Sequence, residues 1–381
     1  LRWYAVVLFG LAFAPWSRAD HYSGSSINYQ CIGSNNYVVT LDLFLDCAGA
    51  GLTPQTLAFS NSCGVTFSLG NIPLVASEEV SQLCPSQLAN STCNGGVLPG
   101  MFHYQFQTVI NLAPCDFWTI GWSICCRNTT QNVQLTPGMY VEATLNNASG
   151  LCDQSPVFGD NTIPYVCVGQ PVFYNPGVTD GDGNTMVFSL RGARYAAPLP
   201  APVNYQAGFT GLQPIPGIVI DPATGQLTFT PTAIGNYVVV IQVNTYDVNG
   251  VLIGRVMRDF LFVVTDCTNP PPVTDGLVNA TAGFIVSPTN FQACEGVPFC
   301  VDVVFTDPDP GALALTTQGL AQLPGATFTV TGGNPAVGTL CWNPDMAFSP
   351  ANIQVVATDP ACPTPNVAST SILVTVVPPL A

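Results

Sequence analysis

The stretch CVGQPVFYNPGVTDGDG (167–183) aligns without a gap with CEGVPFCVDVVFTDPDP (294–310). The positions that match in register are Cys167 with Cys294, Gly169 with Gly296, Pro171 with Pro298, Asp180 with Asp307, and Asp182 with Asp309. Farther along, TGQLTFTPT (224–232) corresponds to VGTLCWNPD (337–345), and NYVVVIQVNTYD (236–247) corresponds to NIQVVATDP (352–360). Because a recurring period is the mark of repeated structural units, the sequence predicts two tandem copies of one domain of about 100 residues.

The apolar runs in each copy are short and rich in Val, Thr, Phe and Tyr, the residues that favour β-strands. YVVVIQVNTY (237–246) and GRVMRDFLFVV (254–264) flank DVNG (247–250), where Asn249-Gly250 is a strong hairpin signal. Short strands separated by regular turns predict an all-β chain of tandem β-sandwich domains of the immunoglobulin-like or cadherin-like kind.

The rest of the chain divides around these two copies. We expect a signal peptide at 1–19, a Cys-rich amino-terminal β-domain at 20–166, the first sandwich at 167–267 and its second copy at 268–378. The linker DCTNPPPVTDG (266–276) is rich in Pro, which stiffens a spacer, so it favours a rod over a compact arrangement.

The first twenty residues, LRWYAVVLFGLAFAPWSRAD, carry one early Arg, an apolar run and a small-residue cleavage pattern ending at Ala19. The alternative, a membrane anchor, needs about 20 apolar residues, and this run is shorter. The sequence therefore predicts an exported protein, secreted or held at the cell surface, with no membrane insertion after signal cleavage.

The charge of the chain limits its partners. Only 8% of the residues are charged, the net charge is −15, and every basic residue is an Arg. A chain without a basic cluster is repelled by phosphate backbones and anionic lipids, so we expect no nucleic-acid partner.

Fifteen Cys in an exported chain indicate a disulfide framework, not a metal site. We expect the bridges Cys167–Cys267, Cys294–Cys362, Cys300–Cys341 and Cys84–Cys93. Neighbouring side chains on a strand point to opposite faces, so Cys125 and Cys126 are expected in two different bridges. Nine Cys fall in the amino-terminal domain, an odd number, which predicts one thiol there that is free or joined to another subunit.

Paired aspartates occur at the same place in both copies, and they have two interpretations. One is turn chemistry, because Asp, Gly and Pro dominate β-turns. The other is calcium, which prefers several oxygen ligands. A third carboxylate follows the later strand of each copy, so the calcium hypothesis assigns Asp180, Asp182 and Asp247 to one site and Asp307, Asp309 and Asp359 to the other. No other cofactor is expected.

The segments DGDGNTMVFSL, IDPATGQLTFTPT, GNYVVVIQV and YDVNG together resemble the immunoglobulin-like and cadherin-like repeats of bacterial surface proteins. The region before them, with INYQCIGSNNYVVTLDLFLDCAG, WSICCRN, ATLNN and SPVF, resembles the amino-terminal module of large secreted proteins of Bacteroidetes. That resemblance implies a role associated with gliding or adhesion.

The residues do not predict an enzyme. His21 lies near the expected mature terminus, His103 has no motif around it, and no nucleophile-elbow or zinc-protease motif occurs. Trp118, Trp122 and Trp342 have two interpretations, sugar stacking or core packing, and their strand-like surroundings favour the core.

Two non-catalytic functions remain. The first is a structural or adhesive surface protein that binds other surface proteins, glycans or copies of itself. The second is a self-assembling subunit of an extracellular filament or sheath, which the low charge and the mean hydropathy of +0.36 also suit.

Overall fold

The computed structural model describes residues 22–49, 51–134, 138–196 and 199–378. The expected signal peptide at 1–19 lies outside these residues. Within them the chain is all-β, and its only helices are short 3-10 turns: η1 (Pro85–Asn90), η2 (Thr92–Asn94), η3 (Leu320–Gln322) and η4 (Met346–Phe348). The predicted all-β, disulfide-rich fold class is confirmed.

The strands of residues 22–265 surround one hydrophobic core, and we call this part the N-terminal body. Its strands are β1 (Tyr22–Cys31), β2 (Asn36–Asp46), β3 (Thr56–Asn61), β4 (Thr66–Gly70), β5 (Leu74–Glu79), β6 (Met101–Asn111), β7 (Trp118–Ile124), β8 (Met139–Leu145), β9 (Val157–Phe158), β10 (Tyr165–Cys167), β11 (Val172–Tyr174), β12 (Val178–Thr179), β13 (Thr185–Leu190), β14 (Arg194–Ala196), β15 (Pro200–Pro202), β16 (Val219–Ile220), β17 (Leu227–Phe229), β18 (Gly235–Tyr246) and β19 (Leu252–Thr265).

The long strand β19 links the amino-terminal region to the first repeat. One edge of β19 pairs with β18, and the other edge pairs in turn with β8, β1 and β10. The result is a single 14-stranded sheet. The expected boundary between residues 166 and 167 therefore does not separate two cores. The sequence pattern identifies β19 as a strand, but it does not show which strands occupy its two edges.

The C-terminal body, residues 273–377, is a β-sandwich around a core of its own. Its strands are β20 (Val273–Val278), β21 (Phe284–Ser287), β22 (Asn290–Cys294), β23 (Phe299–Thr306), β24 (Ala314–Gln318), β25 (Thr327–Gly332), β26 (Ala336–Trp342), β27 (Ala351–Thr358) and β28 (Val367–Val377). They form a four-stranded sheet, β20-β23-β26-β25, and a five-stranded sheet, β21-β22-β28-β27-β24.

The two repeats share their topology. In the first, β10 pairs in parallel with β19, and in the second β22 pairs in parallel with β28. Gly169 donates its N–H to the carbonyl of Pro231 at 2.7 Å, and Gly296 donates to Pro344 at 2.9 Å. Both glycines have positive φ, 75° and 70°, which side-chain-bearing residues rarely adopt. The matched sequence positions thus make matched backbone contacts.

The hairpin predicted around Asn249-Gly250 is confirmed. β18 and β19 pair antiparallel along nearly their whole length, and Gly250 has a φ of 76° in the turn. Asp247 stabilises the turn, because its side chain accepts hydrogen bonds from the N–H groups of Asn249 and Val251.

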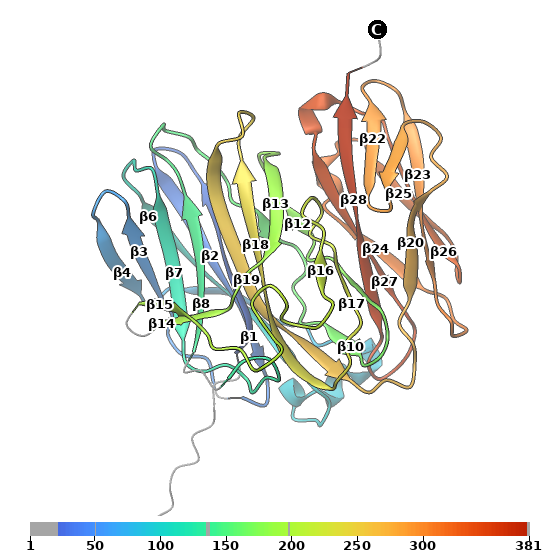
Figure 1. Cartoon of the computed structure of the whole chain (residues 1–381), viewed down its shortest axis with the longest axis horizontal. Helices are drawn as coiled ribbons and strands as arrows, with labels where there is room; N and C mark the ends of the chain where they lie inside the picture. The colour runs from blue at the N-terminus through green and yellow to red at the C-terminus, as the bar shows by residue number, and fades with distance from the viewer. Residues whose placement is uncertain (1–21, 50, 135–137, 197–198, 379–381) are drawn as a thin grey trace, which may run out of the picture.

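The two bodies lie side by side, with strands of each running alongside the other (Figure 1). β11 packs near β28, and β12 packs near β27. The rod expected from the Pro-rich linker is therefore wrong. The linker lets the chain reverse direction between the two bodies. Polar contacts across the junction between the bodies hold the second copy against the first.

Candidate functional site

Buried polar groups connect the bodies at the middle of the junction. The N–H of Asn175 donates to Ser369 Oγ at 2.7 Å, and Gln226 Nε2 donates to the carbonyl of Ser369 at 2.9 Å. Gln354 Nε2 donates to the carbonyl of Asn175 at 2.5 Å. All four residues are buried, and a buried polar group is costly to leave unpaired. The junction is therefore specific in its geometry.

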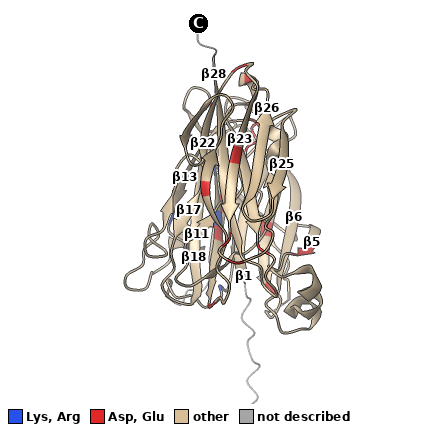
Figure 2. Cartoon of the chain, turned by 90° about the vertical axis from the view of Figure 1, so that its right-hand side faces the viewer, with Lys and Arg blue, Asp and Glu red and all other residues tan. Residues whose placement is uncertain are grey.

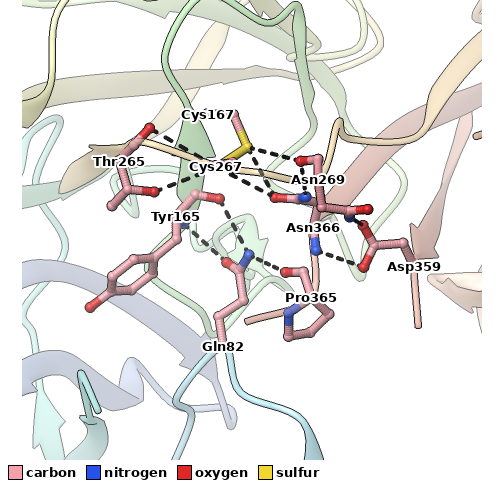
Figure 3. Close-up of a disulfide and its surroundings, with 9 residues drawn as sticks. All are labelled: Gln82, Tyr165, Cys167, Thr265, Cys267, Asn269, Asp359, Pro365 and Asn366. Atoms are coloured by element: carbon pink, nitrogen blue, oxygen red, sulfur yellow. Dashed lines mark hydrogen bonds between the residues drawn. A yellow bond between two sulfur atoms is a disulfide. The ribbon is translucent and has the colours of Figure 1, made fainter. Parts of the chain in front are cut away.

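A second set of contacts surrounds the Cys167–Cys267 disulfide (Figure 3). The side chain of Asn366, from the C-terminal body, donates to the carbonyl of Asn269 at 2.8 Å and contacts the sulfur of Cys167. The carboxylate of Asp359 accepts from the N–H of Asn366 at 3.0 Å and from the side chain of Asn269. Asp359, a predicted calcium ligand, thus organises this end of the junction.

The segment around Gln82 lies on the other side of this cluster. Gln82 Nε2 donates to the carbonyl of Pro365 at 2.8 Å, and Gln82 Oε1 accepts from the N–H of Tyr165 at 3.0 Å (Figure 3). Two residues later, a disulfide joins Cys84 to Cys362 across the two bodies. The junction is therefore closed covalently as well as by hydrogen bonds.

The disulfide predictions have mixed outcomes. Cys167–Cys267 and Cys300–Cys341 are confirmed. Cys84–Cys93 and Cys294–Cys362 are wrong. The remaining bridges, those not predicted, are Cys31–Cys152, Cys47–Cys93, Cys63–Cys115, Cys84–Cys362 and Cys125–Cys126.

The free thiol belongs to Cys294, in the C-terminal body, not to the amino-terminal region. In the first repeat the partner of Cys167 lies two residues after Thr265, where β19 ends. The matching offset from Val377 falls on Pro379, so the sequence offers Cys294 no equivalent partner. Cys125 and Cys126 are bonded to each other, which corrects the expectation of two separate bridges.

In the first repeat, the structure brings Asp180 and Asp182 together with a residue that the sequence analysis missed, Asp153. Asp180 Oδ1 accepts from the N–H groups of Asp182 and Asn184, and Asn184 Nδ2 donates to Asp153 Oδ1 at 2.8 Å. Asp247 belongs to the β18–β19 turn instead. Since Asp153 precedes the repeat, the alignment of the two copies gave no signal for it.

Burial governs the ionisation of this cluster. Asp153 and Asp180 are 4% and 3% exposed. Burial, with the nearby charges of Asp180 and Asp182, raises the pKa of Asp153 to about 7, and burial raises the pKa of Asp180 to about 6. Such carboxyl groups hold protons, or accept a cation, more readily than exposed ones.

In the second repeat, Asp307 and Asp309 form a similar turn, because Asp307 Oδ1 accepts from the N–H of Asp309 at 2.8 Å. Asp359 lies close enough for the charge of Asp307 to help raise its pKa, after burial, which is the main cause. The turn interpretation therefore holds in both copies. Across the described residues, no group of three or more His, Cys, Asp or Glu side chains has the arrangement of a metal site. Calcium stays a prediction.

The other candidate residues have structural roles. Trp118, Trp122 and Trp342 are at most 4% exposed, so their predicted place in the core is confirmed. His103 is 2% exposed, and its ring nitrogens face the carboxylates of Asp42 and Glu78 at 2.9 and 3.4 Å. These contacts could not be predicted from the sequence, because His103, Asp42 and Glu78 lie on separate strands.

Charged residues are sparse along the chain, 8% of all residues, and they are scattered over the ribbon (Figure 2). Among the described residues, no helix is both long and apolar enough to cross a bilayer.

No protein-family model and no curated protein matches this chain. Several solved structures share some likeness. One is the titin Z1Z2 domain pair in complex with telethonin, at 12% identity and a TM-score of 0.19, covering 60% of this chain and 100% of that chain. Another is an I-band fragment of titin, at 9% identity and a TM-score of 0.21, covering 93% and 99%. A third is Dpr2 Ig1-Ig2 in complex with DIP-Theta, at 8% identity and a TM-score of 0.20, covering 92% and 99%. At these TM-scores the matches carry no functional argument.

Proposed function

We propose that this chain is a secreted, non-catalytic protein with a structural or adhesive role at the cell surface. The observation that supports it most directly is the junction, where a disulfide and buried hydrogen bonds hold two β bodies in one arrangement. A fixed β surface suits a protein that has a structural role or presents a binding face. Its partners would be other surface proteins, glycans or copies of itself.

The disulfides support the extracellular part of the proposal. Fourteen of the fifteen Cys are paired in seven bridges. Bridges of this number persist in oxidising compartments and are rare where thiols are kept reduced.

Surface display and adhesion test the proposal. Antibodies against the purified chain should label intact producing cells, and deleting the gene should reduce attachment of those cells to surfaces or to each other. Labelling that requires permeabilised cells, or attachment that is unchanged by the deletion, would contradict the proposal.

One observation favours the filament alternative. β21 forms an edge of its sheet, and its residues Phe284, Ile285 and Val286 are 62%, 38% and 63% exposed. An exposed apolar edge strand without charged residues is a template for pairing with another chain. Electron microscopy of the purified protein separates the two functions, because regular polymers would indicate a filament subunit and single particles a surface protein.

A further inference from the structure

β25 is the last strand of the four-stranded sheet β20-β23-β26-β25. This sheet lies on the side of the C-terminal body that faces away from the N-terminal body (Figure 1). All residues of TFTVTG (327–332) except the half-buried Phe328 are exposed. The strand is rich in Thr, Phe and Val, and residues 310–344 around it include no charged side chain. An uncharged, exposed edge strand can pair with a strand of another chain.

Three other edge strands have features that hinder such pairing. β20 contains Asp275 and a register shift, and β5 contains Glu78, Glu79 and a register shift. β21 is uncharged but is also interrupted by a register shift. Charges and bulges of this kind are the usual protection of edge strands. β25 pairs with β26 without a shift, so it lacks both kinds of protection.

β4 is also uncharged and regular, but pairing there would bury little apolar surface. Its exposed residues are Thr66, Ser68 and Gly70. In β25, Val330 is 44% exposed, although it lies on the same side of the strand as Phe328, which packs against the core. A strand added beside β25 would cover Val330, and the burial of apolar surface favours association. β25 is therefore the better edge for pairing.

Hydrogen bonds of β23 show how the backbone of its sheet is oriented. The carbonyl of Cys300 accepts from the N–H of Thr281 at 2.9 Å, and the N–H of Cys300 donates to Thr281 Oγ1 at 2.8 Å. Both backbone groups of Cys300 therefore point away from β26. Because hydrogen-bonded and non-bonded pairs alternate in an antiparallel ladder, Cys341, the register partner of Cys300, directs its backbone groups toward β25.

The same alternation identifies the groups on the free side of β25. Thr327 is the register partner of Cys341, so Thr327 and every second residue after it bond to β26. The N–H and C=O groups of Phe328, Val330 and Gly332 therefore point outward, away from the sheet. Val330 is the central residue of these three.

This pattern of outward groups is self-complementary. A second β25 placed antiparallel about Val330 would set Val330 opposite Val330, and Phe328 opposite Gly332, in hydrogen-bonded pairs. Residues directly opposite one another lie on the same face of a sheet, so the apolar sides of the two strands would join and the Thr sides would join. An antiparallel β4 would instead set a hydroxyl residue opposite Val330. The strand that fits β25 best is thus a second β25.

The distribution of charge also suits a second copy at this edge. The chain has a net charge of −15, so two copies repel each other in general. The nearest carboxylate on the sheet, that of Asp302, lies on β23, which is separated from β25 by β26. Pairing through β25 therefore sets no carboxylate opposite another.

We propose that two copies of this chain pair through antiparallel β25 strands, forming a two-fold dimer in which the two four-stranded sheets join into one. The inference deepens the proposed function by naming a second copy as a partner, and it rests on that function only in this respect. A purified chain that stays monomeric would refute the dimer while the display and adhesion results stand. A failure of display or adhesion would leave the dimer measurable.

Sedimentation equilibrium of the purified chain tests the proposal. Short edge strands bury a small interface, which is typical of weak complexes, so we expect the average mass to approach that of a dimer at about 100 µM chain and that of a monomer on dilution. Val330→Pro removes an outward N–H without removing a bond to β26, and it should weaken association at least tenfold.

Ser68→Pro is the matched control. The N–H of Asn61 donates to the carbonyl of Val65, so the ladder alternation turns the N–H of Ser68 to the free side of β4. This variant should associate like the unmodified chain. The proposal is overturned if the unmodified chain is monomeric at about 100 µM, if Val330→Pro associates normally, or if Ser68→Pro abolishes association.

A crosslink tests the register without relying on a proline. In a chain that also carries Cys294→Ser, Val330→Cys sets two thiols opposite each other, with Cα atoms about 5.5 Å apart, a distance that a disulfide spans. Oxidised glutathione should convert these two thiols to an intersubunit disulfide, releasing two molecules of reduced glutathione. Ser68→Cys in the same background should stay uncrosslinked. No crosslink from Val330→Cys, or an equal yield from Ser68→Cys, would contradict the proposal.

Discussion

Cys84 and Cys362 lie 278 residues apart in the sequence, and their disulfide holds the two Cα atoms at 5.7 Å. Cys84 immediately precedes η1 of the N-terminal body, and Cys362 lies in the loop between β27 and β28 of the C-terminal body. The N–H of Cys84 also donates to the carbonyl of Pro363 at 2.9 Å. This bridge is the covalent part of the junction.

Replacing Cys84 and Cys362 together by Ser should loosen the junction and lower the free energy of unfolding by about 2–5 kcal/mol, the usual effect of a long-loop disulfide. Calorimetry should show a lower melting temperature, and small-angle scattering a broader particle. The control replaces Cys47 and Cys93, which are bridged within the N-terminal body, and should lower stability while leaving the scattering profile unchanged. Equal scattering from both variants would count against a clamping role.

Arg127→Met should destabilise the N-terminal body by about 3–5 kcal/mol, because it leaves a buried carboxylate without its partner. Arg127 makes a bidentate contact with Asp259 at 2.6 and 2.5 Å, and the side chains are 4% and 0% exposed. Urea unfolding measures the effect. Arg255→Met, which removes a partly exposed Arg on the same strand as Asp259, is the control and should cost much less. A small effect of Arg127→Met would contradict the prediction.

The acidic cluster should make the protein more stable at pH 5 than at pH 8 when a chelator is present. The pKa values of Asp153 and Asp180, about 7 and about 6, lie above their ordinary value of 3.8, so the folded state binds protons more tightly than the unfolded state. Their contribution is complete below that ordinary value and is lost as the pH rises through about 6 to 7.

Asp153→Asn should reduce the loss of stability between pH 5 and pH 8 by about 1–2 kcal/mol, because the amide carries no charge at either pH. Urea unfolding at the two pH values measures the difference. Asp247→Asn is the matched control, since Asp247 lies in the exposed hairpin turn and should leave the pH dependence nearly unchanged. Identical pH profiles for the unmodified chain and Asp153→Asn would refute the assignment.

Excess calcium should raise the melting temperature of the chelated protein at pH 8, because a cation would relieve the repulsion among Asp153, Asp180 and Asp182. Asp182→Asn should diminish the shift, whereas Asp247→Asn should retain it. No shift in the unmodified chain would remove the calcium hypothesis for both repeats.

Alkylation of the denatured, unreduced protein should add a single label, on Cys294. Under native conditions the labelling should be slower, since Cys294 is half-buried and reactivity follows access to the thiolate. Peptide mapping identifies the labelled residue. A label on any Cys of the N-terminal body would contradict the disulfide pattern.

Local features of the fold could be predicted from the sequence. The hairpin at Asn249-Gly250 depends on turn chemistry within a few residues, and the burial of Trp118 and Trp122 follows from strand periodicity. The Cys300–Cys341 bridge was predicted because these two Cys were left after the other pairings in the second copy, and they are register partners on the neighbouring strands β23 and β26.

Contacts between distant segments could not be predicted. Asn175 and Ser369 meet across the junction, yet each is an ordinary polar residue in an apolar strand region. The sequence around Cys84 does not distinguish a bridge to nearby Cys93 from one to distant Cys362. Choosing the partner nearest in the sequence therefore gave the wrong bridge. Asp153 is brought to the acidic cluster by the tertiary fold, so the spacing of residues within the repeat could not predict its position there.

The two copies of the repeat differ in whether each could fold after transfer to another chain. The second has a core and sheets of its own, so a duplication or a fusion could carry it to another chain. In the first copy, one edge of β19 pairs with β1 and β8 of the amino-terminal region. Cutting the chain before Cys167 would leave β1 and β8 without this pairing partner. Duplication of the first copy without the amino-terminal region would therefore yield an incomplete fold. A recombination event that keeps this copy folded must transfer residues 22–265 together.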